Sequence, residues 1–367
     1  MPRTFRTAIL SLIATGLTTF GVVHAQAPTA PGAAPAGGPP GAIPAIPGLN
    51  DVLATVTVGN QTEKVTKGDV IELLSRYPIP DDDRETTYRQ AIDNIVNTKL
   101  LLMFLARQKV TVAAEKVDEE LERLKQKLKS EGQDLATALL QSNKSLEDIR
   151  KTLEERARWQ EFIRTTATDA ELRKYVGNHR DLFRGTQIRA SHILIALEPS
   201  ASAADKDKAK QKLAAIKKDI EGGTISFAVA ANKYSEDPAN TGGAGGDLDY
   251  FSLTSGMIEE FTDVAFKLKK GMVSDPVETP FGFHLIQVTD RKEGKEPDFD
   301  QNKTYILTQY AADLQKEIVT AQKKQAKVDI KPMPKDLFPP AAPATAPAGA
   351  GEKPNGTPGA ATTPKPQ

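Results

Sequence analysis

Two short runs of strand type, each with a histidine inside it, are the segments of this sequence best suited to chemistry. Residues 189–194 contain His192 and residues 280–286 contain His284, and both runs alternate apolar with other residues. An imidazole ring can transfer protons, ligate a metal ion or complete a hydrogen-bonded core. One histidine in a strand is most often structural, so two in matching contexts point to a shared site.

Residues between the two runs could complete such a site. Asp237 follows a predicted helix, a glycine-rich loop over residues 242–246 leads to Leu248, and Met257 and Phe261 come next. The two histidines and Asp237 are metal-ligating residue types, but no two of them have the spacing of one helical turn. The glycines resemble a phosphate-binding loop only superficially, because no lysine and hydroxyl pair follows them. They favour a tight return of the chain toward Leu248.

The order of these motifs resembles the parvulin-type peptidyl-prolyl cis/trans isomerases, over residues 187–291. The resemblance implies the catalytic residues His192, Asp237, Thr279 and His284, with the hydroxyl of Thr279 beside two paired imidazole rings. It implies the substrate-binding residues Leu248, Met257, Phe261 and Phe281, with Phe283 extending the same apolar wall. The family's site holds no metal and uses no cofactor, so neither is expected here.

Rotation about an Xaa-Pro bond needs no nucleophile. Its barrier of ~20 kcal/mol arises from amide resonance, so a site need only bind the twisted amide better than either planar form. An apolar pocket for the proline ring and polar groups around the amide meet that need. Asp237 falls where phosphate-directed members of the family have cysteine, which argues against a thiol nucleophile. The loop over residues 198–202 has no basic cluster, which argues against selection for phosphoserine.

The same segment contains the elements that could position these side chains. Strands are predicted over residues 187–198 and 273–289, and helices over 205–221, 226–234 and 261–267. The alanines of the second helix indicate close packing against a sheet. Together these elements predict a small antiparallel sheet flanked by helices.

Residues 51–183 are predicted to form a mainly helical domain with one small strand pair. Alternating valines over residues 52–58 run into a turn at Gly59-Asn60, which is typical of a hairpin. Helices are predicted over residues 66–77, 85–108 and 113–129, and again after the N-terminal caps Ser145 and Thr168. The charges of the helix at 113–129 indicate a solvated face. His179, at the end of the last helix, is interpreted as a capping or surface residue.

A helix over residues 300–324 and a strand over residues 327–330 follow the isomerase-like segment. This domain order is similar to that of extracytoplasmic foldases of the SurA and PrsA kind, in which the segment after the isomerase domain returns to the N-terminal helices. The resemblance implies an α+β protein. A parvulin domain at 187–291 would be inserted in a mainly α-helical, chaperone-like domain made of residues 51–183 and 298–331.

The two ends of the chain are predicted to lie outside the folded part. Arg3 and Arg6 precede an apolar run that ends in a small-residue cleavage site at Ala25, so residues 1–25 are a predicted signal peptide. The alternative is an uncleaved segment that tethers the protein to a membrane. Residues 26–49 and 332–367 are rich in proline, alanine and glycine and are predicted to be disordered. The predicted location is periplasmic or otherwise extracytoplasmic.

Charge and cysteine content argue against a nucleic-acid-binding protein and against a disulfide-stabilised one. Cleavage after Ala25 would remove two of the 48 basic residues and none of the 48 acidic ones, which leaves 46 against 48. With this balance and no basic stripe, nucleic acid is not the expected partner. The chain has no cysteine, so its stability must come from packing without disulfides.

The predicted function is that of a peptidyl-prolyl isomerase and folding chaperone for secreted or envelope proteins. Its expected partners are unfolded or partly folded polypeptides with Xaa-Pro bonds. The alternative is a holdase chaperone whose parvulin domain has little catalytic activity. The complete set of pocket residues favours the enzyme.

Overall fold

The computed structural model describes residues 48–74, 79, 81–142, 144–198, 200–240 and 243–338. The predicted signal peptide, nearly all of the predicted linker, and the tail beyond residue 338 lie outside the described residues. So do Pro78 and Pro80, the predicted stop of the first helix. No helix within the described ranges is long and apolar enough to cross a membrane.

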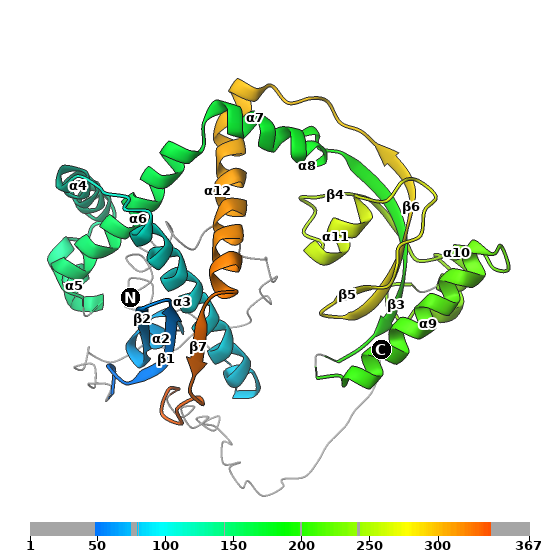
Figure 1. Cartoon of the computed structure of the whole chain (residues 1–367), viewed down its shortest axis with the longest axis horizontal. Coiled ribbons are helices and arrows are strands. Elements are labelled where there is room, and N and C mark those ends of the chain that lie inside the picture. The colour runs from blue at the N-terminus through cyan, green and yellow to red at the C-terminus, as the bar shows by residue number, and fades with distance from the viewer. Residues whose placement is uncertain are drawn as a thin grey trace, which may run out of the picture.

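A three-stranded antiparallel sheet brings together the two ends of the described chain (Figure 1). Its strands are β1 (Val52–Val58), β2 (Gln61–Thr66) and β7 (Lys327–Ile330), in the order β2-β1-β7. Gly59, with φ +62°, makes the tight turn from β1 to β2 that the sequence predicts. On the other side of β1, Thr55 pairs with Asp329, so the predicted C-terminal strand completes the N-terminal sheet.

Two helices cover this sheet. α2 (Lys67–Leu74) follows β2 directly, and α3 (Arg84–Arg107) begins after one 3₁₀ turn at Asp81–Asp83. The apolar residues of α3 recur at helical spacing, so Ile92 and Leu100 are fully buried on one side. The helix predicted over residues 85–108 is confirmed.

Three further helices form a small core of their own. They are α4 (Ala114–Ser130), α5 (Leu135–Ser142) and α6 (Leu146–Thr166). α4 buries one apolar stripe that includes Leu121 and Leu128, and its charges lie on the other side, as predicted. Ser145 caps α6 as predicted: its hydroxyl accepts from the Asp148 backbone at 3.1 Å, and its own N–H donates to the Asp148 carboxylate at 2.8 Å.

The long helix α12 (Phe299–Lys323) packs against α3 and α7 (Asp169–Asn178). Its residues Ala311 and Ile318 share a core with Leu101 of α3 and Trp159 of α6. His179 separates α7 from the short α8 (Arg180–Arg184), and its Nδ1 lies 2.9 Å from the Tyr175 carbonyl oxygen. This position confirms the capping interpretation.

Residues 331–338, the C-terminal strap, pack onto the N-terminal core. The Tyr88 hydroxyl donates to the Lys331 carbonyl at 2.9 Å, and Leu337 is only 5% exposed. Nζ of the buried Lys67 lies 2.6 Å from the Asp336 carboxylate. The prediction that disorder begins at residue 332 is therefore wrong for the strap. It was based on the average composition of the whole tail, which does not reveal that the single residue Leu337 is buried.

The second sheet has four antiparallel strands in the order β4-β3-β6-β5. They are β3 (Gln187–Ala196), β4 (Asp247–Ser252), β5 (Val277–Thr279) and β6 (Gly282–Lys292). α9 (Ala203–Glu221) and α10 (Phe227–Tyr234) pack on one face, and α11 (Glu259–Ala265) packs on the other. Figure 1 shows α11 on the side of this sheet that faces α12. The chain is an α+β protein, as predicted.

The two segments that connect the helical part to the second sheet meet closely. A Cβ at Gly294 would lie 1.6 Å from the Arg184 carbonyl oxygen, so this approach requires glycine. The Arg184 guanidinium pairs with Glu296 and, at 3.4 Å, with Glu293. These contacts hold the entry and exit of the second sheet side by side.

Candidate active site

Strand pairing places the two histidines on one face of the second sheet. Leu194 of β3 is opposite His284 of β6, and His192 is opposite Ile286. Because side chains alternate along a strand, His192 and His284 share a face. Their Nδ1 atoms lie 3.2 Å apart, their rings stack with centroids 5.4 Å apart, and both side chains are buried.

Each histidine has a polar partner on its outer nitrogen. Nε2 of His192 lies 2.6 Å from an Asp237 carboxylate oxygen, and Nε2 of His284 lies 2.8 Å from the Thr279 hydroxyl. Asp237 comes from the loop after α10, and Thr279 ends β5, which pairs with β6. The structure thus brings the four predicted catalytic residues into one hydrogen-bonded chain from Asp237 to Thr279.

Hydrogen positions along this chain follow from what each atom can do. A carboxylate only accepts, so Nε2 of His192 carries a hydrogen toward Asp237. With His192 neutral, its Nδ1 accepts from Nδ1–H of His284, whose Nε2 then accepts from the Thr279 hydroxyl. A proton added to Nδ1 of His192 reverses both remaining bonds. The chain therefore stays fully satisfied in either charge state of His192.

The surroundings favour a neutral ring at His284 and a charged carboxylate at Asp237. Burial, together with the neighbouring His192, lowers the pKa of His284 from 6.5 to about 4, so this ring is neutral at pH 7. Burial alone would raise the pKa of Asp237, but hydrogen bonds from the Ala239 backbone and from His192 outweigh it and keep the pKa below its ordinary value. Asp237 is therefore a partly exposed carboxylate at one end of the hydrogen-bonded chain, and His284 is a neutral, buried base near the other end.

The glycine-rich loop lets the chain approach the first histidine closely. The His192 N–H donates to the Gly246 carbonyl at 2.9 Å, and a Cβ at Gly246 would lie 2.2 Å from the His192 carbonyl oxygen. Gly242 lies outside the described residues. Asn232 and Asn240, which were not predicted, accept from the Gly245 and Gly246 N–H groups at 2.8 and 2.7 Å. Their position around a glycine run is the only sequence feature that could have indicated them.

An apolar cluster lies against the histidine pair. The Phe261 ring meets both imidazoles edge-on, with centroids 5.9 Å from His192 and 5.6 Å from His284. Leu248 and Met257 are half-buried in the same cluster. The structure therefore places these three predicted pocket residues together, next to the polar chain.

The two phenylalanines around Gly282 behave differently from each other. Phe281 is 61% exposed, and its backbone is held at both ends, by the Thr279 hydroxyl at 3.2 Å and by the Leu197 N–H at 3.1 Å. Phe283 is buried on the opposite face of the sheet, under α9 and α10. The prediction that Phe283 extends the pocket wall is wrong, because its side chain alternates with that of His284.

Comparison with known proteins identifies the family. Residues 170–292 match the PPIC-type PPIASE domain. The chain is 35% identical over 211 residues to the foldase protein PrsA of Geobacillus sp., which covers 56% of this chain and 65% of the relative. It is 30% identical over 253 residues to the foldase protein PrsA of Geobacillus kaustophilus, which covers 67% of this chain and 75% of that relative. The chain belongs to the PrsA foldase family.

A solved structure of the peptidylprolyl isomerase PrsA from Bacillus cereus is 27% identical, with a TM-score of 0.36. That match covers 75% of this chain and 92% of the other. Within this PrsA-family chain, the matched isomerase domain includes all of the second sheet and every residue of the hydrogen-bonded chain. The predicted recognition of a parvulin domain is confirmed.

The low pKa of His284 predicts that acid weakens the domain before most carboxylates titrate. The folded ring has a pKa of about 4 and the ordinary value is 6.5, so between these pH values the unfolded chain binds a proton that the folded chain does not. Stability should therefore fall from pH 6.5 to pH 4, by up to ~3 kcal/mol. Asp237, whose pKa is lowered from 3.8, adds a further loss below that value.

Urea unfolding at pH 7 and pH 4.5 would measure this effect. In His284→Asn the amide can still reach His192 but has no such titration, so most of the difference between the two pH values should disappear. An equal difference in both proteins would show that another group is responsible.

Proposed function

We propose that this protein is a peptidyl-prolyl cis/trans isomerase that acts on Xaa-Pro bonds of unfolded or partly folded polypeptides. The observation that carries the proposal is the position of the polar chain from Asp237 to Thr279 against the apolar cluster of Leu248, Met257 and Phe261. Membership of the PrsA family and the matched isomerase domain support it.

Non-covalent stabilisation of a twisted amide accounts for the residue types. Leu248, Met257 and Phe261 would hold the proline ring, and the exposed Phe281 would contact a neighbouring side chain. When the bond twists, resonance is lost and the carbonyl oxygen loses partial negative charge. A carboxylate at Asp237 repels the twisted amide less than the planar one, which favours the transition state.

The buried part of the chain would act by positioning. His192 holds Asp237 through a 2.6 Å contact, and His284 and Thr279 hold His192 in turn. The neutral His284 can either accept from His192 or donate to it. His192 can therefore keep its hydrogen bond to the Asp237 carboxylate in either case. No residue in this arrangement has to form a covalent bond with the substrate, and none has to hold a cofactor or metal.

The remainder of the chain is proposed to bind clients and reach them outside the cytoplasm. Residues 51–183 and 298–331 would form one chaperone-like domain, with the isomerase domain of residues 187–291 inserted. Pairing of β1 with β7 supports this division. The predicted signal peptide supports a periplasmic or otherwise extracytoplasmic location, and the N-terminus of the purified protein, read by mass spectrometry, tests it.

A protease-coupled assay tests the activity. A protease that cleaves only the trans isomer of a short Xaa-Pro peptide reports the rate at which the cis form converts. The protein without residues 1–25 should accelerate the slow phase in proportion to its concentration. If the rate equals that of buffer while aggregation of an unfolded client is still suppressed, the protein is a holdase and not an isomerase.

A further inference from the structure

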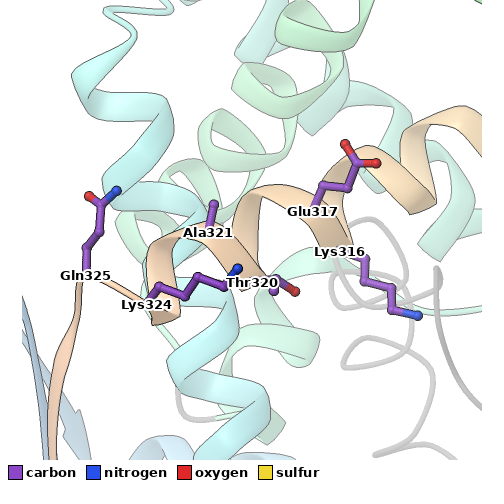
Figure 2. A pocket seen from close by; sticks show the side chains of 6 residues that line it. All are labelled: Lys316, Glu317, Thr320, Ala321, Lys324 and Gln325. Carbon is purple, nitrogen blue, oxygen red and sulfur yellow. The ribbon is translucent and has the colours of Figure 1, made fainter.

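The last turns of α12 carry a hollow on the side seen in Figure 2. Six side chains line it, namely Lys316, Glu317, Thr320, Ala321, Lys324 and Gln325. Figure 2 shows them following the helix to its end, where Gln325 stands at the start of the segment that leads into β7. The lining includes two lysines and one glutamate.

A second hollow begins where the first one ends, since Gln325 lines both. It lies between the β1–β2 turn and the C-terminal ends of α3 and α12. Five of its lining residues are carboxamides, Asn60, Gln61, Gln108, Gln322 and Gln325, and Phe104 supplies apolar surface. We refer to these five residues and Phe104 as the amide groove.

Most carboxamide side chains of the groove make no hydrogen bond within the described part of the chain. Within the described part of the chain, only Gln322 uses its side chain, whose oxygen accepts from Arg107. The side chains of Gln61, Gln108 and Gln325 are exposed and make no hydrogen bond to the described protein. No carboxylate lines this hollow. Each free amide offers both donors and an acceptor, which is what an extended peptide backbone requires.

The far end of the first hollow from the amide groove contacts the isomerase domain through one ion pair. Lys316 of α12 pairs with Glu259, the first residue of α11. Glu259 begins the helix that carries Phe261 and comes two residues after Met257 in the sequence. Both charged side chains are exposed, 61% and 65%, so the pair is weak and a passing chain could displace it.

We propose that the amide groove binds the main chain of an extended client polypeptide while a proline of the same client occupies the isomerase site. This inference rests on the proposed function and adds the path that the client follows, from α11 across Lys316 to the β1–β2 turn. Backbone recognition by amides makes the groove indifferent to client sequence, and Phe104 adds apolar contact. The occupant is an unfolded polypeptide and not a folded partner, because a folded surface has few free backbone groups.

The test compares Gln61→Ala/Gln325→Ala with the matched control Gln90→Ala/Gln211→Ala, which changes two exposed glutamines outside the groove. Fluorescence anisotropy would measure binding of a labelled, proline-free unfolded polypeptide to the full chain. The groove variant should bind about fivefold more weakly, as expected for two lost backbone hydrogen bonds, and the control should bind like the unchanged protein. Equal binding by all three proteins would overturn the proposal.

Activity on two substrates separates this inference from the proposed function. The groove variant should isomerise a short peptide at the normal rate, but its kcat/KM on an unfolded protein should fall by about fivefold. If the unchanged protein does not isomerise the short peptide, the proposed function is wrong. The binding comparison still shows whether the amide groove binds an unfolded polypeptide.

A photo-crosslinking residue at Gln325 provides a test that does not depend on the folding of the double variant. It should capture the labelled polypeptide, whereas the same residue at Gln211 should not. Capture at Gln211 alone would place the client elsewhere and overturn the proposal.

Discussion

Replacing Met257 by alanine should lower kcat/KM for a short Xaa-Pro peptide by about thirtyfold. Met257 is half-buried beside Phe261, so its loss opens the proposed proline pocket without emptying the core. The side-chain atoms removed contribute about 2 kcal/mol of apolar contact with the proline ring in the transition state. That free energy corresponds to about thirtyfold in rate. The protease-coupled assay measures it directly.

Met272→Ala is the matched control, since Met272 belongs to the same domain but is 54% exposed and lies outside the apolar cluster. This substitution should leave kcat/KM within twofold of the unchanged protein, and the circular dichroism of both variants should show an intact fold. A normal rate for Met257→Ala would remove this residue from the pocket. A similar loss in both variants would indicate a general effect on the domain.

Leu337→Ala should destabilise the helical part of the protein by about 2 to 5 kcal/mol, the usual range for a buried leucine. Leu337 is 5% exposed and packs with β1, α2 and α3, although it belongs to a tail rich in proline, alanine and glycine. The protein has one tryptophan, Trp159, which lies in α6 within the helical part. Its fluorescence during urea unfolding therefore reports the stability of the part that Leu337 supports.

Leu140→Ala makes the same chemical change at a residue that is 81% exposed on α5. The free energy of unfolding should change by less than about 0.5 kcal/mol there. Equal stability of the Leu337 and Leu140 variants would mean that the strap contributes nothing to the core. Isomerisation of a short peptide should be unaffected by either substitution, since neither residue contacts the second sheet.

Local patterns were sufficient to predict most elements, and the resemblance to the parvulin family supplied the predicted site residues. The alternation around His192 and His284 predicted two strands, and the register of β3 and β6 then brings the two rings to one face. Ser145 and Asp148 predicted the start of α6 because a capping box is a local device. The pairing of Thr279 with His284 came from family resemblance and not from spacing.

Other features depended on contacts that a local pattern does not contain. Phe283 resembles a pocket residue in sequence, but alternation places it on the opposite face from His284. α5 was not predicted, since its eight residues are too few to show a convincing helical period. The strap was not predicted because its contacts are distant in the sequence: Leu337 is buried by a core built mainly from residues 53–103.

The pairing of β7 with β1 has a consequence for the order in which the protein is assembled. A chain delivered N-terminus first presents β1 long before Asp329, the partner of Thr55, becomes available. The four strands of the second sheet all lie between Gln187 and Lys292, so that sheet can close earlier. Loop closure over such a long separation is slow. One edge of β1 in this PrsA-family protein therefore stays unpaired until β7, the last of the described strands, has been delivered.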